Sequence, residues 1–193
     1  MRKSTEKILA AAGERIWQYA ELKIGDVEFS EEVVAACRAN YCGNYNKSWR
    51  CPPNVGTLEE LKEKYTKYPE VFVFTTKHEI EDSFDIEGMF AARLEHDKVE
   101  NLIRPVLPEG SQVLGAGGCN VCEKCAFPEP CRFPEKAKTS VEACGINVVS
   151  LAKTAKINYT NGENTVTYFT LVLLNGDETE RSGIESDSQF QTA

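Results

Sequence analysis

Four cysteines fall within one short run of the sequence, GGCNVCEKCAFPEPCRFP: Cys119, Cys122, Cys125 and Cys131. Their spacing is C-x2-C-x2-C-x5-C, so the first three thiols recur at one pitch. Thiols at this pitch can face a common centre, which is what an iron–sulfur cluster needs around its inorganic core. The run therefore predicts a metal centre, with a [4Fe–4S] cluster ligated by the first three cysteines.

The fourth ligand of this cluster is left open by the spacing. The first three cysteines match the bacterial ferredoxin run C-x2-C-x2-C-x3-C-P. The next cysteine, Cys131, lies two residues too far along, and the proline comes only at Pro134. Either Cys131 or Cys51 can then supply the fourth thiolate. Glycines at 115, 117 and 118 precede the run, and they allow main-chain N–H groups to approach an anionic cluster closely.

A second group of cysteines, Cys37, Cys42 and Cys51, has the spacing C-x4-C-x8-C-P-P. The segment is rich in Asn, Gly, Tyr and Pro, which predicts a loop long enough to curl around a metal. Two arrangements follow. The group adds Cys51 to the main cluster, or it builds a second cluster that Cys131 completes. Three thiols without a fourth would leave one iron open to a substrate, as in an iron–sulfur enzyme.

Zinc is the alternative metal. A zinc site usually pairs C-x2-C with a distant second pair of cysteines or histidines, and neither His78 nor His96 has a partner histidine nearby. Both are expected to be ordinary surface or core residues. The carboxylates of Glu129 and Glu142 stand near cysteines, but no spacing gives them a role.

The remaining cysteine and the aromatic residues of the first group have simpler predicted roles. Cys144 lies in the apolar stretch VEACGINV and is expected to pack in the core. Tyr41, Tyr45 and Trp49 alternate with the first cysteines and are expected to shield the site.

The bulk properties narrow the class of protein. A chain of 193 residues with 41% hydrophobic residues can bury one core, expected over residues 1–176, with a polar, flexible tail over 177–193. The net charge of −8 argues against nucleic-acid binding. No apolar run reaches the roughly 18 residues of a membrane helix. Clustered thiols predict the reducing cytoplasm and a redox partner protein.

The hydrophobic periodicity predicts alternating helices and strands. Helices are expected over residues 4–20, 31–37, 57–68, 86–104 and 148–156. Strands are expected over 21–29, 71–74, 111–116 and 165–174, the last forming a hairpin with 156–159. The order predicts an α/β or α+β fold, a mixed sheet flanked by helices, with the cysteine-rich, metal-binding loops at one end.

Three helix starts have capping signals, and one helix has a predicted buried face. Ser30 and Asp85 each precede a helix, and Thr57 with Glu60 forms a capping box. The helix over 86–104 is expected to bury an apolar stripe made of Ile86, Met89, Phe90, Leu94, Val99, Leu102 and Ile103.

Two stretches together resemble a known family: CRANYCGNYNKSWRCPP and GGCNVCEKCAFPEPCRFPEKAKTSVEACGINV. They are similar to microbial proteins grouped as a domain of unknown function, the predicted metal-binding proteins of anaerobic bacteria and archaea. The resemblance extends from about residue 30 to residue 174. It implies metal binding by Cys37, Cys42, Cys51, Cys119, Cys122, Cys125 and Cys131. Electron transfer is the function expected first, with an iron–sulfur enzyme and a zinc-stabilised interaction module as alternatives.

Overall fold

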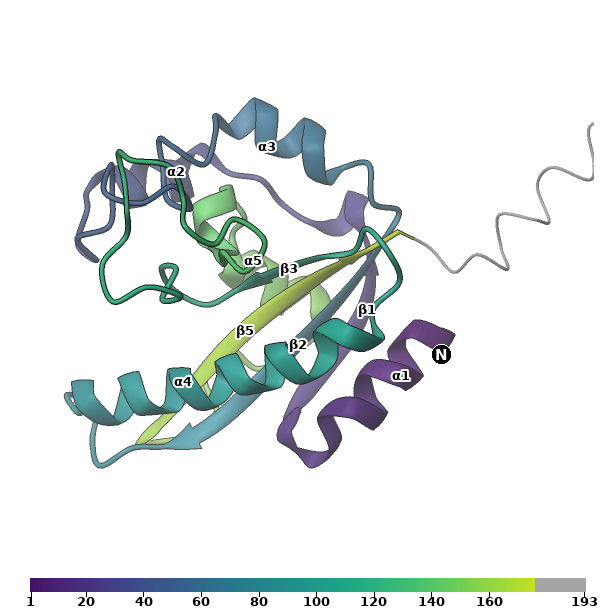
Figure 1. Ribbon diagram of the computed structural model, residues 1–193. Helices are drawn as coiled ribbons and strands as arrows, with labels where there is room; N and C mark the ends of the chain where they lie inside the picture. The colour runs from purple at the N-terminus through teal and green to yellow at the C-terminus, as the bar shows by residue number, and fades with distance from the viewer. Residues whose placement is uncertain (176–193) are drawn as a thin grey trace, which may run out of the picture.

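The computed structural model describes residues 1–175, and a mixed sheet of five strands runs through them (Figure 1). In order across the sheet, the strands are β1 (Gln18–Lys23), β2 (Glu70–Glu79), β5 (Thr165–Leu174), β3 (Gln112–Gly115) and β4 (Thr139–Ser140). Neighbouring strands are antiparallel, except for the parallel pair of β3 and β4. The predicted mixed sheet is confirmed, whereas the predicted tail over 177–193 lies outside the described residues.

Helices cover both faces of this sheet (Figure 1). On one face lie α1 (Lys3–Ala12) and α4 (Ile86–Ile103), and on the other lie α3 (Leu58–Tyr65) and α5 (Val148–Ala155). The remaining helix, α2 (Glu31–Arg38), lies beside the cysteine-bearing loops. No helix among residues 1–175 is long and apolar enough to cross a membrane.

Two apolar cores form because successive side chains of the central strands point to opposite faces. Val71 and Val73 of β2 pack with α3 and α5, whereas Phe72 and Phe74 pack with α1 and α4. Strand β5 alternates in the same way, so both strands are buried on both faces. The prediction that the strand beginning at Val71 is central is confirmed.

The predicted capping signals are present at three helix starts. The side chain of Ser30 accepts a hydrogen bond from the first turn of α2. Thr57 and Glu60 form both bonds of a capping box at α3, with distances of 3.2 and 2.8 Å. Asp85 accepts the N–H of Gly88 over 2.8 Å at the start of α4. These local bonds fix where the helices begin.

The prediction of one helix over residues 4–20 was wrong, because α1 ends at Ala12. Gly13 follows with a φ of +60°, a conformation that stops a right-handed helix. The N–H of Trp17 already bonds to the carbonyl of Thr75 over 2.8 Å, so this residue extends the pairing of β1 with β2. The first strand therefore occupies 18–23 rather than 21–29.

The apolar stripe predicted for α4 was also wrong in most of its members. Ile86, Phe90, Leu94 and Leu102 are exposed. The helix buries Ala92, Val99 and Ile103 together with three polar residues: His96, Asp97 and Glu100. Helical periodicity alone cannot find this face, since it depends on polar partners from other elements.

The hairpin predicted between residues 156–159 and the last strand does not form. Strand β5 pairs with β2 on one side and β3 on the other. Lys156 adopts a φ of +55° and ends α5, and Ile157 then packs into the core on the α3 and α5 side. The segment is held by burial rather than by strand pairing.

Candidate metal centre

Strand β3 leads directly into the second cysteine loop, which spans residues 116–138 and returns as β4. The start of this loop lies against α4. Arg93 of α4 donates to the carbonyl of Gly118 over 2.6 Å. A Cβ atom on Gly115 would stand only 2.0 Å from Oε1 of Glu100, and one on Gly117 only 2.6 Å from the Arg93 guanidinium. The glycines are therefore needed for this close approach of loop and helix.

The four cysteines of this loop line one small cavity, which we call the quartet pocket. Its thiols belong to Cys119, Cys122, Cys125 and Cys131. The other residues of its wall are Ser48, Trp49, Arg50, Val121, Ala126, Arg132, Phe133 and Ala137. All four cysteines are partly buried. The structure thus brings Cys131 to the first three thiols.

Hydrogen-bond donors surround one thiol of the quartet pocket. Burial by itself would raise the pKa of Cys125, but N–H groups of Phe127 and Trp49 and the hydroxyl of Ser48 outweigh it and lower that pKa. Such donors stabilise a thiolate, and hydrogen bonds to sulfur are one of the ways a protein adjusts the potential of an iron–sulfur cluster. Two loops supply them, since residues 48 and 49 belong to the first cysteine segment.

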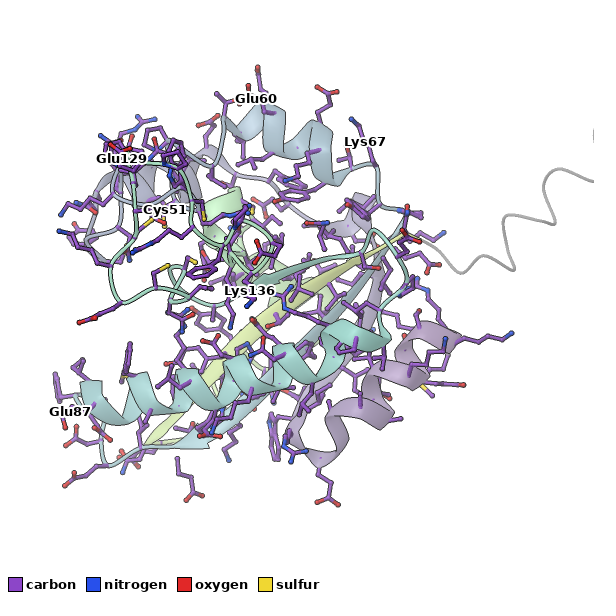
Figure 2. The ribbon with its side chains drawn as sticks, in the orientation of Figure 1. Cys51, Glu60, Lys67, Glu87, Glu129 and Lys136 are labelled. Atoms are coloured by element: carbon purple, nitrogen blue, oxygen red, sulfur yellow. The ribbon has the colours of Figure 1, made fainter. Side chains whose placement is uncertain are left out.

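The first cysteine group lines a separate cavity of about 250 Å³, which we call the trio pocket. Its thiols belong to Cys37, Cys42 and Cys51. The other residues of its wall are Asn44, Tyr45, Pro52, Gly117, Gly118, Ser140, Glu142 and Ala143. Both cysteine loops therefore contribute to this cavity. Figure 2 shows Cys51 inside the loop region and Glu129 at its outer surface.

The three thiols of the trio pocket influence one another. Burial and the neighbouring thiols of Cys42 and Cys37 raise the pKa of Cys51 to about 11. Burial, then Cys42 and Glu142, likewise raise the pKa of Cys37. Clustered acidic groups of this kind release protons when a cation binds, since the bound form is the thiolate.

The candidate ligand thiols are spread over two cavities. Within residues 1–175, no group of three or more cysteine, histidine, aspartate or glutamate side chains converges closely enough to hold one metal ion. The seven thiols instead line the walls of two cavities.

The aromatic residues of the first loop divide between the two cavities. Trp49 lines the quartet pocket and Tyr45 lines the trio pocket. Tyr41 is 96% exposed and shields neither cavity. Cys144 lies in the core with its sulfur 3.5 Å from the hydroxyl of Tyr65, as its apolar surroundings predict.

A buried polar network lies between the sheet and α4, beside the start of the second cysteine loop. His96 is fully buried, and its ring nitrogens lie 2.8 Å from the Thr76 hydroxyl and 2.7 Å from the Thr170 hydroxyl. Thr170 donates to Glu100 over 2.8 Å. His96, Thr170 and Glu100 each have a hydrogen-bond partner, which is the condition for placing them in a core.

Lys138 connects this network to the cysteines. Its Nζ lies 3.1 Å from Asp97 and 3.6 Å from Glu100, and its main-chain N–H donates to the sulfur of Cys119 over 3.4 Å. Asn120 donates to the other oxygen of Asp97 over 2.5 Å. Asp97 of α4 therefore binds both Asn120, the residue after Cys119, and Lys138, whose N–H donates to Cys119.

One residue of the site was missed at the sequence level. Glu142 lines the trio pocket, although no spacing or motif singles it out. Glu142 lies in the turn between β4 and α5. This turn packs against α2, which is about 100 residues earlier in the sequence.

Comparison with known proteins gives one match. No curated protein and no solved structure matches the chain. A family described as predicted metal-binding protein (DUF2284) matches residues 20–174, which include both cysteine groups and four of the five strands in full. The chain therefore belongs to this family of predicted metal-binding proteins.

Proposed function

We propose that the protein binds two iron–sulfur clusters, one in each thiol-lined pocket, and that it transfers electrons. The observation that carries this proposal is the division of seven cysteines between two cavities, four in one and three in the other. Metal binding is the property that the family description gives. The iron–sulfur identity is argued from the thiol-only donors of the quartet pocket and from the spacing of its cysteines.

The quartet pocket suits an electron carrier. Four thiolates from Cys119, Cys122, Cys125 and Cys131 would complete the coordination of a [4Fe–4S] cluster, which supplies one-electron redox chemistry when bound. Main-chain N–H groups of Phe127 and Trp49 and the side chain of Ser48 bond to the sulfur of Cys125. Arg50 and Arg132 line the same cavity and offset the negative charge of a thiolate-ligated cluster.

The setting of this function follows from the thiol chemistry. All eight cysteines are free thiols in the structure, a state that a reducing compartment maintains. We therefore place the protein in the cytoplasm, with a redox partner protein as the donor or acceptor of electrons.

The test is metal analysis of protein purified without oxygen. We compare the full chain with Cys122→Ser, which removes a thiol of the quartet pocket, and Cys42→Ser, which removes one of the trio pocket. Cys144→Ser is the matched control, because it changes a buried thiol outside both cavities. Each of the first two variants is expected to lose about four irons and four acid-labile sulfides per chain, and the control none.

The outcomes separate the alternatives. Loss of iron and sulfide in both variants supports two clusters. Loss in Cys122→Ser alone reduces the proposal to one cluster. Zinc without acid-labile sulfide overturns it and selects a zinc-stabilised module. Iron content that neither variant changes also overturns it, since the metal would then lie elsewhere.

A further inference from the structure

Glu142 lies where the trio pocket meets the surface. Among residues 1–175, it is the one carboxylate in the wall of this cavity. It also lines a neighbouring groove of about 420 Å³, and Cys37 and Cys42 line both spaces as well. Two thiols and one carboxylate therefore stand at the boundary between an enclosed cavity and an open groove.

The position of Glu142 is fixed by the backbone around it. The sulfur of Cys37 lies 3.9 Å from the Glu142 carbonyl, 105 residues away in sequence. The turn closes at Gly145, which has a φ of +74°. A Cβ atom at this position would lie only 2.3 Å from the side chain of Leu58, so the turn favours glycine here. The N–H of Ser30 bonds to the carbonyl of Gly145 over 2.7 Å. Helix α2, which carries Cys37, is thus tied to the turn that carries Glu142.

The surroundings of the Glu142 side chain are those of a concave wall. Glu142 is exposed by its accessible area, and it lines both the trio pocket and the neighbouring groove.

Among residues 1–175, no fourth cysteine lines the trio pocket, and Cys119, whose charge acts on Cys51, lines the quartet pocket instead. Cys131 lies in the quartet pocket, and Cys144 is buried in the core against Tyr65. A cluster held by Cys37, Cys42 and Cys51 would then have one iron without a thiolate.

We propose that Glu142 supplies this missing ligand, so that the trio site combines three thiolates with one carboxylate oxygen. The inference rests on the proposed function, because it requires a cluster at the trio pocket. Carboxylate is a harder ligand than thiolate and holds iron of a sulfide cluster less firmly. The position is therefore exchangeable, and the groove gives a small molecule access to it.

The groove defines the class of molecule that would take this position. Its walls are mainly apolar and aromatic: Val33, Ala36, Tyr41, Ile146, Val148, Val149 and Tyr159. A ligand that fits them has an apolar body and an oxygen-donor head that replaces the carboxylate of Glu142. Benzoate is a simple probe with both parts.

The experiment is controlled oxidation of the full chain, with ferricyanide as the oxidant. A [4Fe–4S]2+ core that loses its exchangeable iron releases one Fe2+ and gives one electron to ferricyanide, leaving [3Fe–4S]+, which has its own electron paramagnetic resonance signal. Released iron and this signal are both measured. The variants are Glu142→Gln and Glu142→Cys, and the matched control is Glu129→Gln, an exposed glutamate that lines neither cavity.

Glu142→Gln is expected to release the iron at least about tenfold faster than the unmodified chain. Glu142→Cys is expected to suppress the release and the signal, because a fourth thiolate holds the iron. Glu129→Gln should behave like the unmodified chain. Equal release in all three variants overturns the inference.

The failure of this inference is distinct from failure of the proposed function. If Cys42→Ser leaves the iron content unchanged, no cluster occupies the trio pocket and the proposed function itself fails there. If that variant loses iron but the Glu142 variants do not differ from the control, the assignment of Glu142 alone is wrong. Benzoate should alter the resonance of the reduced protein and not that of Glu142→Cys. An unaltered resonance in the unmodified chain overturns the role of the groove.

Discussion

The indole N–H of Trp49 donates a hydrogen bond of 2.8 Å to the main-chain carbonyl of Glu129, 80 residues further along the chain. The bond joins the first cysteine loop to the second. The same indole meets the ring of Phe127 edge-on with centroids 5.0 Å apart, and Arg50 donates to the carbonyl of Pro134 over 2.9 Å. Side chains of one loop thus hold the backbone of the other around the quartet pocket.

Replacing Trp49 by phenylalanine should loosen this contact between the loops. The change keeps an aromatic ring and removes the N–H, so we expect the metal-free protein to lose about 1 kcal/mol of unfolding free energy. Release of metal from the quartet pocket to a chelator should become several-fold faster.

The control for this change is Trp17→Phe. Trp17 makes a similar bond of 2.9 Å to Asn161, away from the cysteines. It should affect stability to a similar extent and leave the rate of metal release unchanged. Equal release rates in the two variants would mean that the Trp49 bond does not hold the site.

Lys138→Met should destabilise the protein strongly. The ammonium group lies between Asp97 and Glu100, and only 12% of the lysine side chain is exposed. Removing it leaves two buried carboxyl groups without their cation, which costs about 3 kcal/mol or more. Chemical denaturation measures the difference.

The exposed pair of Lys98 with Glu95 is the matched control. Lys98→Met on the same side of the molecule should cost less than about 1 kcal/mol, since both partners are in water. If the two lysine variants lose equal stability, the buried position of Lys138 has no special importance.

Gly115→Ala should disturb the start of the second cysteine loop. The added methyl group would meet Oε1 of Glu100 at 2.0 Å, a carboxylate already held by a hydrogen bond from Thr170 and an ion pair with Lys138. We expect a loss of about 1–3 kcal/mol from overpacking, measured as the free energy of unfolding. Gly25→Ala, where a Cβ atom meets nothing within 4 Å, should be neutral. A neutral Gly115→Ala would show that Glu100 can move aside.

His96 should make the protein sensitive to acid. Burial, and to a lesser extent the nearby cations, lower the pKa of His96 to about 3, against about 6.5 in an unfolded chain. The unfolded state therefore binds the proton first, and stability falls as the pH drops from about 6.5 towards 3.

The size of this effect can be isolated with His96→Gln, which does not titrate. Between pH 7 and pH 5, the unmodified protein should lose about 2 kcal/mol more unfolding free energy than the variant. The comparison uses metal-free protein, so that metal release does not contribute. Parallel pH curves for the two proteins would show that His96 is protonated in the folded state as readily as in the unfolded state.

The sequence predicted the starts of helices well where a side chain forms a hydrogen bond with the main chain of the next few residues. Ser30, Thr57 with Glu60, and Asp85 cap the helices that they were expected to cap. The strand over 165–174 is observed with the predicted bounds, because β-branched and apolar residues fill it without interruption.

Long-range relationships could not be predicted in the same way. The buried face of α4 contains His96 and Glu100, which are stable there because Thr76, Thr170 and Lys138 reach them from three other elements. Spacing grouped the thiols into two sets but left the place of Cys131 open, since two loops far apart in sequence build each cavity. No local pattern marks Glu142 for the same reason.

Strand β5 comes last among the described strands and yet lies in the middle of the sheet, between β2 and β3. While the chain is being synthesised, the edges that β2 and β3 offer to it remain open until its residues leave the ribosome. The platform beneath both cysteine loops is therefore complete only after the residues of β5 have been added. Metal delivered before that moment would meet thiols that have no fixed neighbours, so loading of the proposed metal site has to follow the pairing of β5 with β2 and β3.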